Sequence, residues 1–259
     1  MLEYLPVIIA ALAGSCLSFF CGFGLGTLLL PAFLLFFPLE IAIAASAVVH
    51  MLNNIFKLVL VGKYADWSVI KGFGLMSVVG AIVGALSLTL VSHLSPIATY
   101  SMRGAAYNIT PINLIVGLII IGFAVLEVSP RFQKMTFSKR MLPVGGLVSG
   151  YFGGLSGHQG ALRSAFLMKA GLSKEAFIGT RVVAAMLVDF SRITVYSTQI
   201  KSGWTLINPY LVTAATLAAF TGAWLGNKWM KKTELSVINI IISIALVLFG
   251  IALIAGLTN

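Results

Sequence analysis

The sequence predicts an all-α polytopic membrane protein with two inverted-topology repeats. Each repeat would be a glycine-broken hairpin, re-entrant or discontinuous, followed by three full transmembrane helices. Composition is the first observation behind this: 59% of the 259 residues are hydrophobic and 9% are charged, against about 25% charged in a soluble domain. The apolar residues also form blocks of roughly 16 to 25, the length that crosses a bilayer as a helix. The alternation typical of membrane β-strands is absent.

The third observation is that the order of blocks is duplicated. The first half has a broken run at 5–37, spans at 39–61, 69–91 and 111–128, and a polar loop at 92–110. The second half has a broken run at 141–171 and spans at 174–200, 204–229 and 235–257. We therefore expect a first repeat at 1–130, a basic cytoplasmic linker at 131–140 and a second repeat at 141–259. A shift of 134 residues pairs Gly26 with Gly160 and Ser46 with Thr180.

The distribution of Lys and Arg predicts the topology. If each broken run enters and leaves on one side, with the N-terminus outside, the loop cations expected inside are Lys63, Lys71, Arg131, Lys134, Lys139, Arg140, Lys169, Lys174, Lys228, Lys231 and Lys232. Outside, the loops keep only Arg103 and Lys201. This asymmetry predicts a multi-pass inner (plasma) membrane protein with both termini on the periplasmic or outer side. The two halves are then inverted, as in alternating-access transporters.

The net charge of +10 does not indicate nucleic acid as a partner, because the basic residues lie singly or in short clusters between apolar blocks. The acidic start of the chain does not resemble a signal peptide. The three histidines are far apart, with no Cys or Glu spaced to share a metal. We expect no metal and no cofactor, and we leave a homodimer open.

Glycines interrupt both broken runs and predict a substrate cavity between them. Non-helical backbone at membrane depth is tolerated where it lines a wet cavity, and the half-helices that follow would direct free N–H groups at an anion. Close helix packing through small residues is the alternative. The candidate binding residues in the two breaks are Gly22, Gly24, Gly26, Ser156, Gly157, His158 and Gln159.

Ionisable side chains inside spans are costly and therefore candidates for function. Arg181 and Arg192 are eleven residues apart, within about 20° of one another on a helix. The other candidate ligands are His50, Asn54 and Lys57 in the first half and Arg163 in the second. Snorkelling to the interface is the alternative for Lys57, Arg163 and Arg181.

Coupling to a proton gradient would need groups that titrate within the spans. Asp189 is placed one turn before Arg192 and away from the ends of its span, whereas Glu127 is placed at a span end. His50 and His158 are the other groups in the spans that could titrate near neutral pH, and of these candidates we expect Asp189 and His50 to form the proton relay. An ion pair between Asp189 and Arg192 is the structural alternative.

Several motifs together resemble the sulfite exporter TauE/SafE family (the toluene-sulfonate uptake permease family). They are residues 22–31 (GFGLGTLLLP), 154–160 (GLSGHQG), 179–181 (GTR) and 62–67 (GKYADW). The resemblance covers nearly the whole chain and implies a secondary transporter for sulfite, sulfonates or related sulfur compounds. Arg163 and Arg192 match no motif of the family, which leaves the substrate open.

Two rival functions are weighed against the transporter. A passive anion channel would share the basic cavity but need no coupling gradient. The stretch Gly-Ala-Leu-Arg-Ser at 160–164 faintly resembles a phosphate-binding motif of intramembrane lipid-phosphate enzymes. Such chemistry, however, needs carboxylates beside the phosphate. We therefore expect a protein that is not an enzyme, whose partners are a small anionic substrate and the lipid bilayer.

Overall fold

The computed structural model describes residues 2–18, 24–102, 104–135, 137–168, 170–199, 203–229 and 236–258. The helices of the first half are α1 (Leu5–Leu17), α2 (Leu25–Phe33), α3 (Leu39–Val61), α4 (Trp67–Val69), α5 (Leu75–Ser92) and α6 (Pro111–Val128). Those that follow are α7 (Pro130–Lys134), α8 (Leu142–Ser156), α9 (Gly160–Leu167), α10 (Lys174–Gln199), α11 (Pro209–Trp229) and α12 (Ser236–Ile254). The shorter helical turns are η1 (Leu2–Tyr4), η2 (Gly62–Tyr64), η3 (Ile70–Gly74), η4 (Lys139–Met141) and η5 (Gly203–Leu206).

Several helices satisfy the physical requirements of a membrane span. Within the described residues, three are long and apolar enough to cross a bilayer, at Leu39–Tyr64, Trp67–Ser92 and Pro111–Val128. The bounds of α3 and α6 are those that the sequence predicts. The 26-residue helix α10 is long enough but carries Arg181, Asp189 and Arg192 in its middle turns. The chain is thus a mainly helical protein with the character of a membrane protein.

The predicted loop at 92–110 is wrong, because this stretch contains a β-hairpin. Strands β1 (Ala98–Met102) and β2 (Ala105–Ile109) pair antiparallel, with Tyr100 opposite Tyr107. The two rings stack with centroids 5.3 Å apart, and aromatic cross-strand pairs stabilise such hairpins. The Tyr100 hydroxyl donates to the carbonyl of Ala255 at 2.7 Å. The hairpin is therefore fixed to the end of α12.

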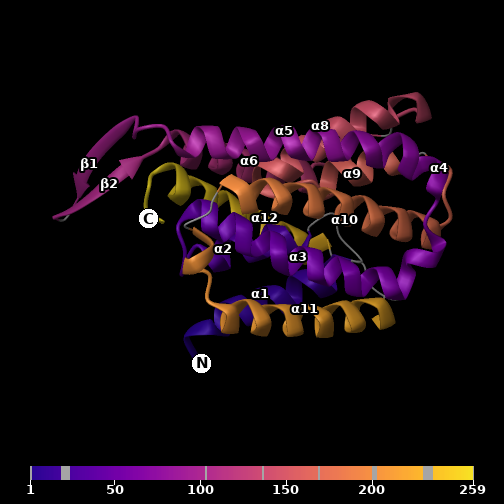
Figure 1. Cartoon of the computed structure of the whole chain (residues 1–259), viewed down its shortest axis with the longest axis horizontal. Helices are drawn as coiled ribbons and strands as arrows, with labels where there is room; N and C mark the ends of the chain where they lie inside the picture. The colour runs from indigo at the N-terminus through magenta and orange to yellow at the C-terminus, as the bar shows by residue number, and fades with distance from the viewer. Residues whose placement is uncertain are drawn as a thin grey trace.

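The two halves pack against each other along several pairs of helices (Figure 1). Antiparallel α3 and α10 lie at the centre, α1 packs along α11, α5 along α8, and α6 along α12. Glycines allow the closest of these approaches: a Cβ built on Gly154 of α8 would lie 2.0 Å from the carbonyl oxygen of Ala81 in α5. At Gly222 of α11 the corresponding distance to the Leu12 carbonyl oxygen in α1 is 2.2 Å. Small residues thus set the helix spacing at these two interfaces.

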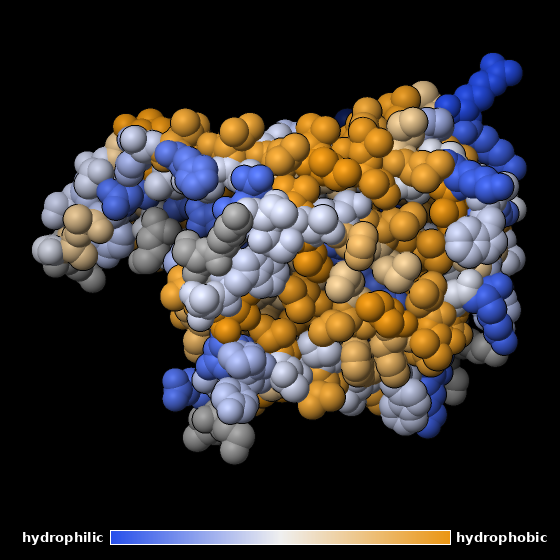
Figure 2. Space-filling view, viewed as in Figure 1, coloured by the Kyte–Doolittle hydropathy of each residue, from blue (hydrophilic) through white to orange (hydrophobic). Residues whose placement is uncertain are grey.

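The surface is apolar in the middle and hydrophilic at both ends (Figure 2). The two chain ends and the β-hairpin lie together at one end, and α4 lies at the other (Figure 1). The exposed Lys and Arg side chains of the described residues belong to segments at the α4 end: Lys63, Lys71, Arg131, Lys134, Lys139, Arg140, Lys174 and Lys228. Of the cations in the topology prediction, Arg103 and Lys201, expected outside, and Lys169, Lys231 and Lys232, expected inside, lie outside the described residues.

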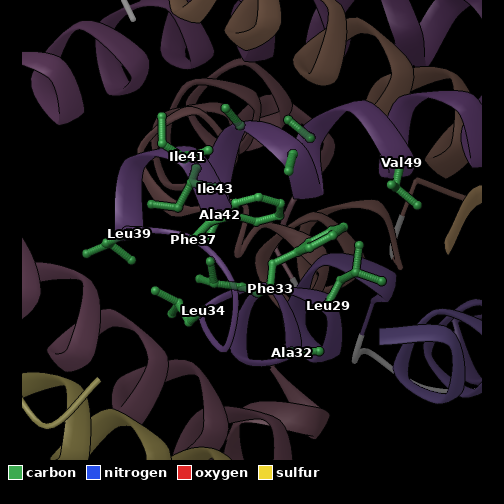
Figure 3. Close-up of a cluster of buried hydrophobic side chains, with 14 of the residues drawn as sticks. Leu29, Ala32, Phe33, Leu34, Phe37, Leu39, Ile41, Ala42, Ile43 and Val49 are labelled. Carbon is green, nitrogen blue, oxygen red and sulfur yellow. The ribbon is translucent and has the colours of Figure 1, made fainter. Parts of the chain in front are cut away.

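A cluster of apolar side chains fixes α2 against the start of α3 (Figure 3). Phe33 is fully buried and its ring lies 5.9 Å from that of Phe37. Leu29 is also fully buried in this cluster. Burial of each such side chain stabilises the fold by roughly 1.5–3 kcal/mol. This packing holds α2 in a defined position against α3.

Candidate functional site

The two glycine breaks meet inside the molecule. Gly22 lies outside the described residues, but Gly24 precedes α2 in an extended conformation (φ −100°, ψ 170°). Gly157 ends α8 with φ +83°, a left-handed conformation that favours glycine. Gly26, near the start of α2, faces the carbonyl of Gly157, since a Cβ built on Gly26 would lie 3.6 Å from that oxygen. Two segments more than a hundred residues apart thus come together.

A cavity of about 40 Å³ lies beside these breaks. Both halves of the chain line it: Ser18, Gly24, His50, Asn54, Lys57, Gly160, Arg163, Ile178, Arg181, Val182 and Ala185. A single water occupies roughly 10–15 Å³ by this measure, so the space suits a few waters or one small oxyanion. Six of the predicted binding residues therefore surround one space: Gly24, His50, Asn54, Lys57, Arg163 and Arg181.

Three of the lining residues are cationic, and two of these are deeply buried. Lys57 is 5% exposed and Arg163 is 7% exposed, so neither side chain snorkels to the membrane interface. The Lys57 ammonium donates to the Ser18 hydroxyl at 2.5 Å. It also donates to the Asn53 side-chain oxygen at 3.1 Å, when that amide takes the orientation its neighbours require. These contacts hold the ammonium beside the first glycine break.

Arg163 has unused hydrogen-bonding capacity. Its Nε and Nη1 atoms are buried and have no hydrogen-bond partner among the described residues. Arg163 and Lys57 also repel each other, and both lie within electrostatic range of Arg181. Buried cations that face one cavity are costly unless an opposite charge joins them. The site is therefore suited to an anion.

Asp189 is the centre of a network that links α3 to α10. Its Oδ2 lies 2.6 Å from Nδ1 of His50 and accepts from Nδ2 of Asn54 at 2.7 Å. Its Oδ1 accepts from Nε and Nη2 of Arg192 at 3.0 and 2.7 Å. Asp189 is fully buried, and Arg192 is 1% exposed. The ion pair anticipated from the i, i+3 spacing is therefore present.

Arg192 lies beside the second break rather than in the lining of the cavity. Its Nη1 donates to the Gly153 carbonyl at 3.4 Å. A Cβ built on Gly157 would lie 2.9 Å from the same Nη1 atom. Tyr196, one turn further along α10, donates its hydroxyl to the Gly154 carbonyl. These two side chains hold the C-terminal end of α8 against α10.

The predicted residues Ser156, His158 and Gln159 are buried but do not line the main cavity. His158 belongs to a second, smaller cavity of about 10 Å³. Its lining residues are Thr27, Phe123, Glu127, His158, Gly160 and Ala161. Gly160 lines both cavities, so the second break separates two small spaces.

Ser18 and Glu127 are among the lining residues that the sequence did not indicate. Ser18 directly follows α1 and contacts Lys57; a hydroxyl at the end of a half-helix was the available signal. Glu127 is one residue from the end of α6, and the sequence places it at a span end, but its Oε2 atom is buried. Its side chain points into the protein, and no sequence pattern indicates that direction.

Metal binding finds no support in the part of the chain that the structure describes. No group of three or more His, Cys, Asp or Glu side chains is placed there to hold an ion. Of the two cysteines, Cys16 is a free, partly buried thiol, and Cys21 lies outside the described residues.

The chain was also compared with known proteins. The family model described as sulfite exporter TauE/SafE matches residues 7–253, nearly the whole chain. No curated protein and no solved structure matches it.

Proposed function

We propose, on the premise that this chain belongs to the sulfite exporter TauE/SafE family, that it carries a small sulfur oxyanion bound in the cavity between the two breaks. Membership in the family implies a membrane transporter of sulfur-containing anions, which fits a protein that is not an enzyme. The finer proposal is that sulfite, a sulfonate or a related compound binds to Lys57, Arg163 and Arg181.

One observation carries this proposal: Arg163 faces the cavity with two buried N–H groups that have no partner among the described residues. A guanidinium group matches oxyanions because it presents several donors in one plane. Three oxygens on one sulfur atom would let Lys57 and Arg181 share the same ligand. The ligand would also relieve the repulsion among the three cations.

Two helix N-termini support the same conclusion. Gly24 immediately precedes α2, and Gly160 is the first residue of α9, and both line the cavity. The first N–H groups of a helix lack partners within it and carry the positive end of its dipole. A small anion between these helices would therefore be attracted by backbone groups from both halves.

We further propose that transport proceeds by alternating access of two inverted repeats, 1–130 and 141–259, joined by the linker 131–140. The packing of α1 on α11 and of α5 on α8 supports this. In the proposed duplication α1 corresponds to α8 and α11 corresponds to α5, so the two contacts are the same contact repeated. The central helices α3 and α10, which the proposed duplication pairs, are antiparallel (Figure 1). Inverted repeats commonly place the substrate between them near the bilayer midplane.

We propose that the protein lies in the inner membrane, with the α4 end in the cytoplasm and both termini outside. The exposed cations at the α4 end support it. We also keep the proposal that His50 and Asp189 form a proton relay beside the anion. Their hydrogen bond and the position of His50 in the cavity lining support that role.

Thermal unfolding of purified protein with sulfite, a sulfonate, thiosulfate or a simple carboxylate tests the site. A ligand at a hundred times its Kd should stabilise the protein by about 2.7 kcal/mol. We expect at least one sulfur oxyanion to do so, and Arg163→Met to reduce the effect strongly at the same ligand concentration. The matched control is Arg140→Met, which removes an exposed cation from η4.

Flux of radiolabelled sulfite into proteoliposomes completes the test of function. Saturable flux that is stimulated by unlabelled sulfite on the other side indicates a transporter rather than a channel. If no oxyanion stabilises the protein, or if Arg163→Met responds as the wild type does, the proposed anion site is wrong.

A further inference from the structure

The second cavity contains a histidine whose hydrogen bonds define its tautomer. Nδ1 of His158 lies 3.1 Å from the Ser156 carbonyl oxygen and 3.3 Å from the Ser156 hydroxyl oxygen. A carbonyl oxygen only accepts, and the Ser156 hydroxyl already donates to the Phe152 carbonyl at 3.2 Å. Nδ1 must therefore carry the proton. In a neutral imidazole, Nε2 is then an acceptor with a free lone pair.

The lone pair on Nε2 has no partner among the described residues, and His158 is 3% exposed. The His158 ring is held in place by Phe123, whose ring is nearly parallel to it (17°) with centroids 6.4 Å apart. Both rings line the second cavity. An unused acceptor in a fixed, buried position is costly unless a donor reaches it.

Glu127 lines the same cavity from α6, with its Oε2 buried. An ionised carboxylate is also an acceptor, so two acceptors share a space of about 10 Å³. That volume is about the size of one water molecule. A proton, carried directly or through one water, would give the unpartnered Nε2 of His158 its donor beside the Glu127 carboxylate.

We propose that Glu127 and His158 form a proton-binding site that is separate from the anion cavity and couples proton movement to anion binding. The proton moves between the Glu127 carboxylate and Nε2 of His158, and Nδ1 keeps its own proton throughout. Gly160 lines both cavities and lies two residues after His158. A proton on this pair adds positive charge beside the N-terminus of α9, where the anion is proposed to bind.

Glu127 and His158 are the two residues with titratable side chains in the lining of the second cavity. Arg181 of α10 lies within electrostatic range of Glu127, and Arg192 of the same helix lies within range of His158. The remaining lining residues, from α2, α6 and α9, are Thr27, Phe123, Gly160 and Ala161. Arg163 is the one charged residue of α9. Of the other helices that pack on α6, α7 carries Arg131 and Lys134, and the described parts of α5, α8 and α12 have no charged residue.

Nitrogen NMR of protein labelled with ¹⁵N-histidine tests the site without any transport. Only three histidines are present, so His158→Gln assigns the resonance. We expect Nε2 of His158 to titrate, and Glu127→Gln to move the midpoint by about one pH unit or more, as removal of a neighbouring charge does. Glu175→Gln, an exposed carboxylate at the start of α10, is the matched control and should leave it unchanged.

An Nε2 resonance that Glu127→Gln leaves unchanged across the whole pH range would overturn the proposal. If Glu127→Gln does not fold, Glu127→Asp replaces it. That variant withdraws the carboxylate by one methylene and should shift the midpoint by a smaller amount. No change in a folded Glu127→Asp variant would overturn the proposal equally.

A transport assay is the second test of this proposal, and it rests on the proposed function. If one proton accompanies each anion, a gradient of one pH unit drives about a tenfold accumulation in proteoliposomes. Glu127→Gln should lower that ratio to about one while anion exchange at equal pH on both sides continues. Loss of exchange together with accumulation would assign Glu127 to the anion site instead. A failure of all transport in the wild type would count against the proposed function, and the NMR titration would still decide the proton site.

Discussion

Nδ1 of His50 lies 2.6 Å from Oδ2 of Asp189, although 139 residues separate the two in the chain. The contact joins α3 to α10, the central helices of the two halves. Asp189 also binds Arg192 through its other oxygen. One buried carboxylate therefore connects a cavity residue of the first half with the side chain that holds the second glycine break.

Replacing Asp189 with Asn should destabilise the protein strongly. The change removes the partner of Arg192, a buried cation, and such losses cost about 3–5 kcal/mol. Equilibrium unfolding in mixed micelles would measure the difference. Glu175→Gln removes the same charge from an exposed position and should change stability by less than about 0.5 kcal/mol. Equal effects of the two variants would contradict the central role of Asp189.

Arg163→Met should have opposite effects on stability and binding. Without an anion, it removes a buried cation with two unpartnered N–H groups, so we expect a stabilisation of roughly 1–3 kcal/mol. With an anion, the loss of charge-assisted hydrogen bonds should weaken binding by roughly 10- to 100-fold. Unfolding with and without sulfite measures both quantities. A variant that is less stable without ligand would indicate that Arg163 is a structural residue.

Gly154→Ala should disrupt the contact between α8 and α5. Its Cβ would fall 2.0 Å from the Ala81 carbonyl oxygen, so the helices must separate. Such overpacking costs about 1–3 kcal/mol. Gly122→Ala is the matched control, because nothing lies within 4 Å of a Cβ there. Thermal unfolding of the two variants should therefore differ, and similar midpoints would mean that the interface is not tightly packed.

Asp66 should make stability dependent on acid pH. Its carboxylate accepts from the Ser68 hydroxyl and from the backbone N–H groups of Ser68 and Val69, and these hydrogen bonds lower the pKa of Asp66. A lowered folded-state pKa means that the cap stabilises the protein above the unfolded value of about 3.9. The stabilisation is lost as the pH falls through the folded-state pKa.

The Asp66 cap can be tested with two substitutions. Asp66→Ala should cost about 1 kcal/mol at neutral pH, the usual value of an N-cap. Asp66→Asn should keep most of the cap but lose this contribution to the pH dependence. Unfolding measured between neutral and acid pH separates the two effects. A wild type and an Asn variant with the same dependence on pH would show that Asp66 does not stabilise the fold through its charge.

The sequence by itself determined the class of fold and the boundaries of most helices. Apolar length and the cost of unsatisfied backbone in lipid leave helices as the spanning element, which is why α3 and α6 match their predicted bounds. It also indicated Lys57, Arg163 and Arg181 as candidates, because charges inside spans are rare. The β-hairpin was missed because its strands are short and partly polar, and because its docking contact is with distant Ala255.

Only the tertiary structure decided which of these groups act together. Helical spacing places Arg181 and Arg192 on one face of α10, but it does not say that Arg181 faces the cavity while Arg192 binds Asp189. The inward direction of Glu127 likewise depends on where α9 packs against α6. Local sequence encodes the length and polarity of a helix, whereas contacts between helices depend on packing across the whole chain. For that reason the residues of the site were predictable one by one, and the two cavities were not.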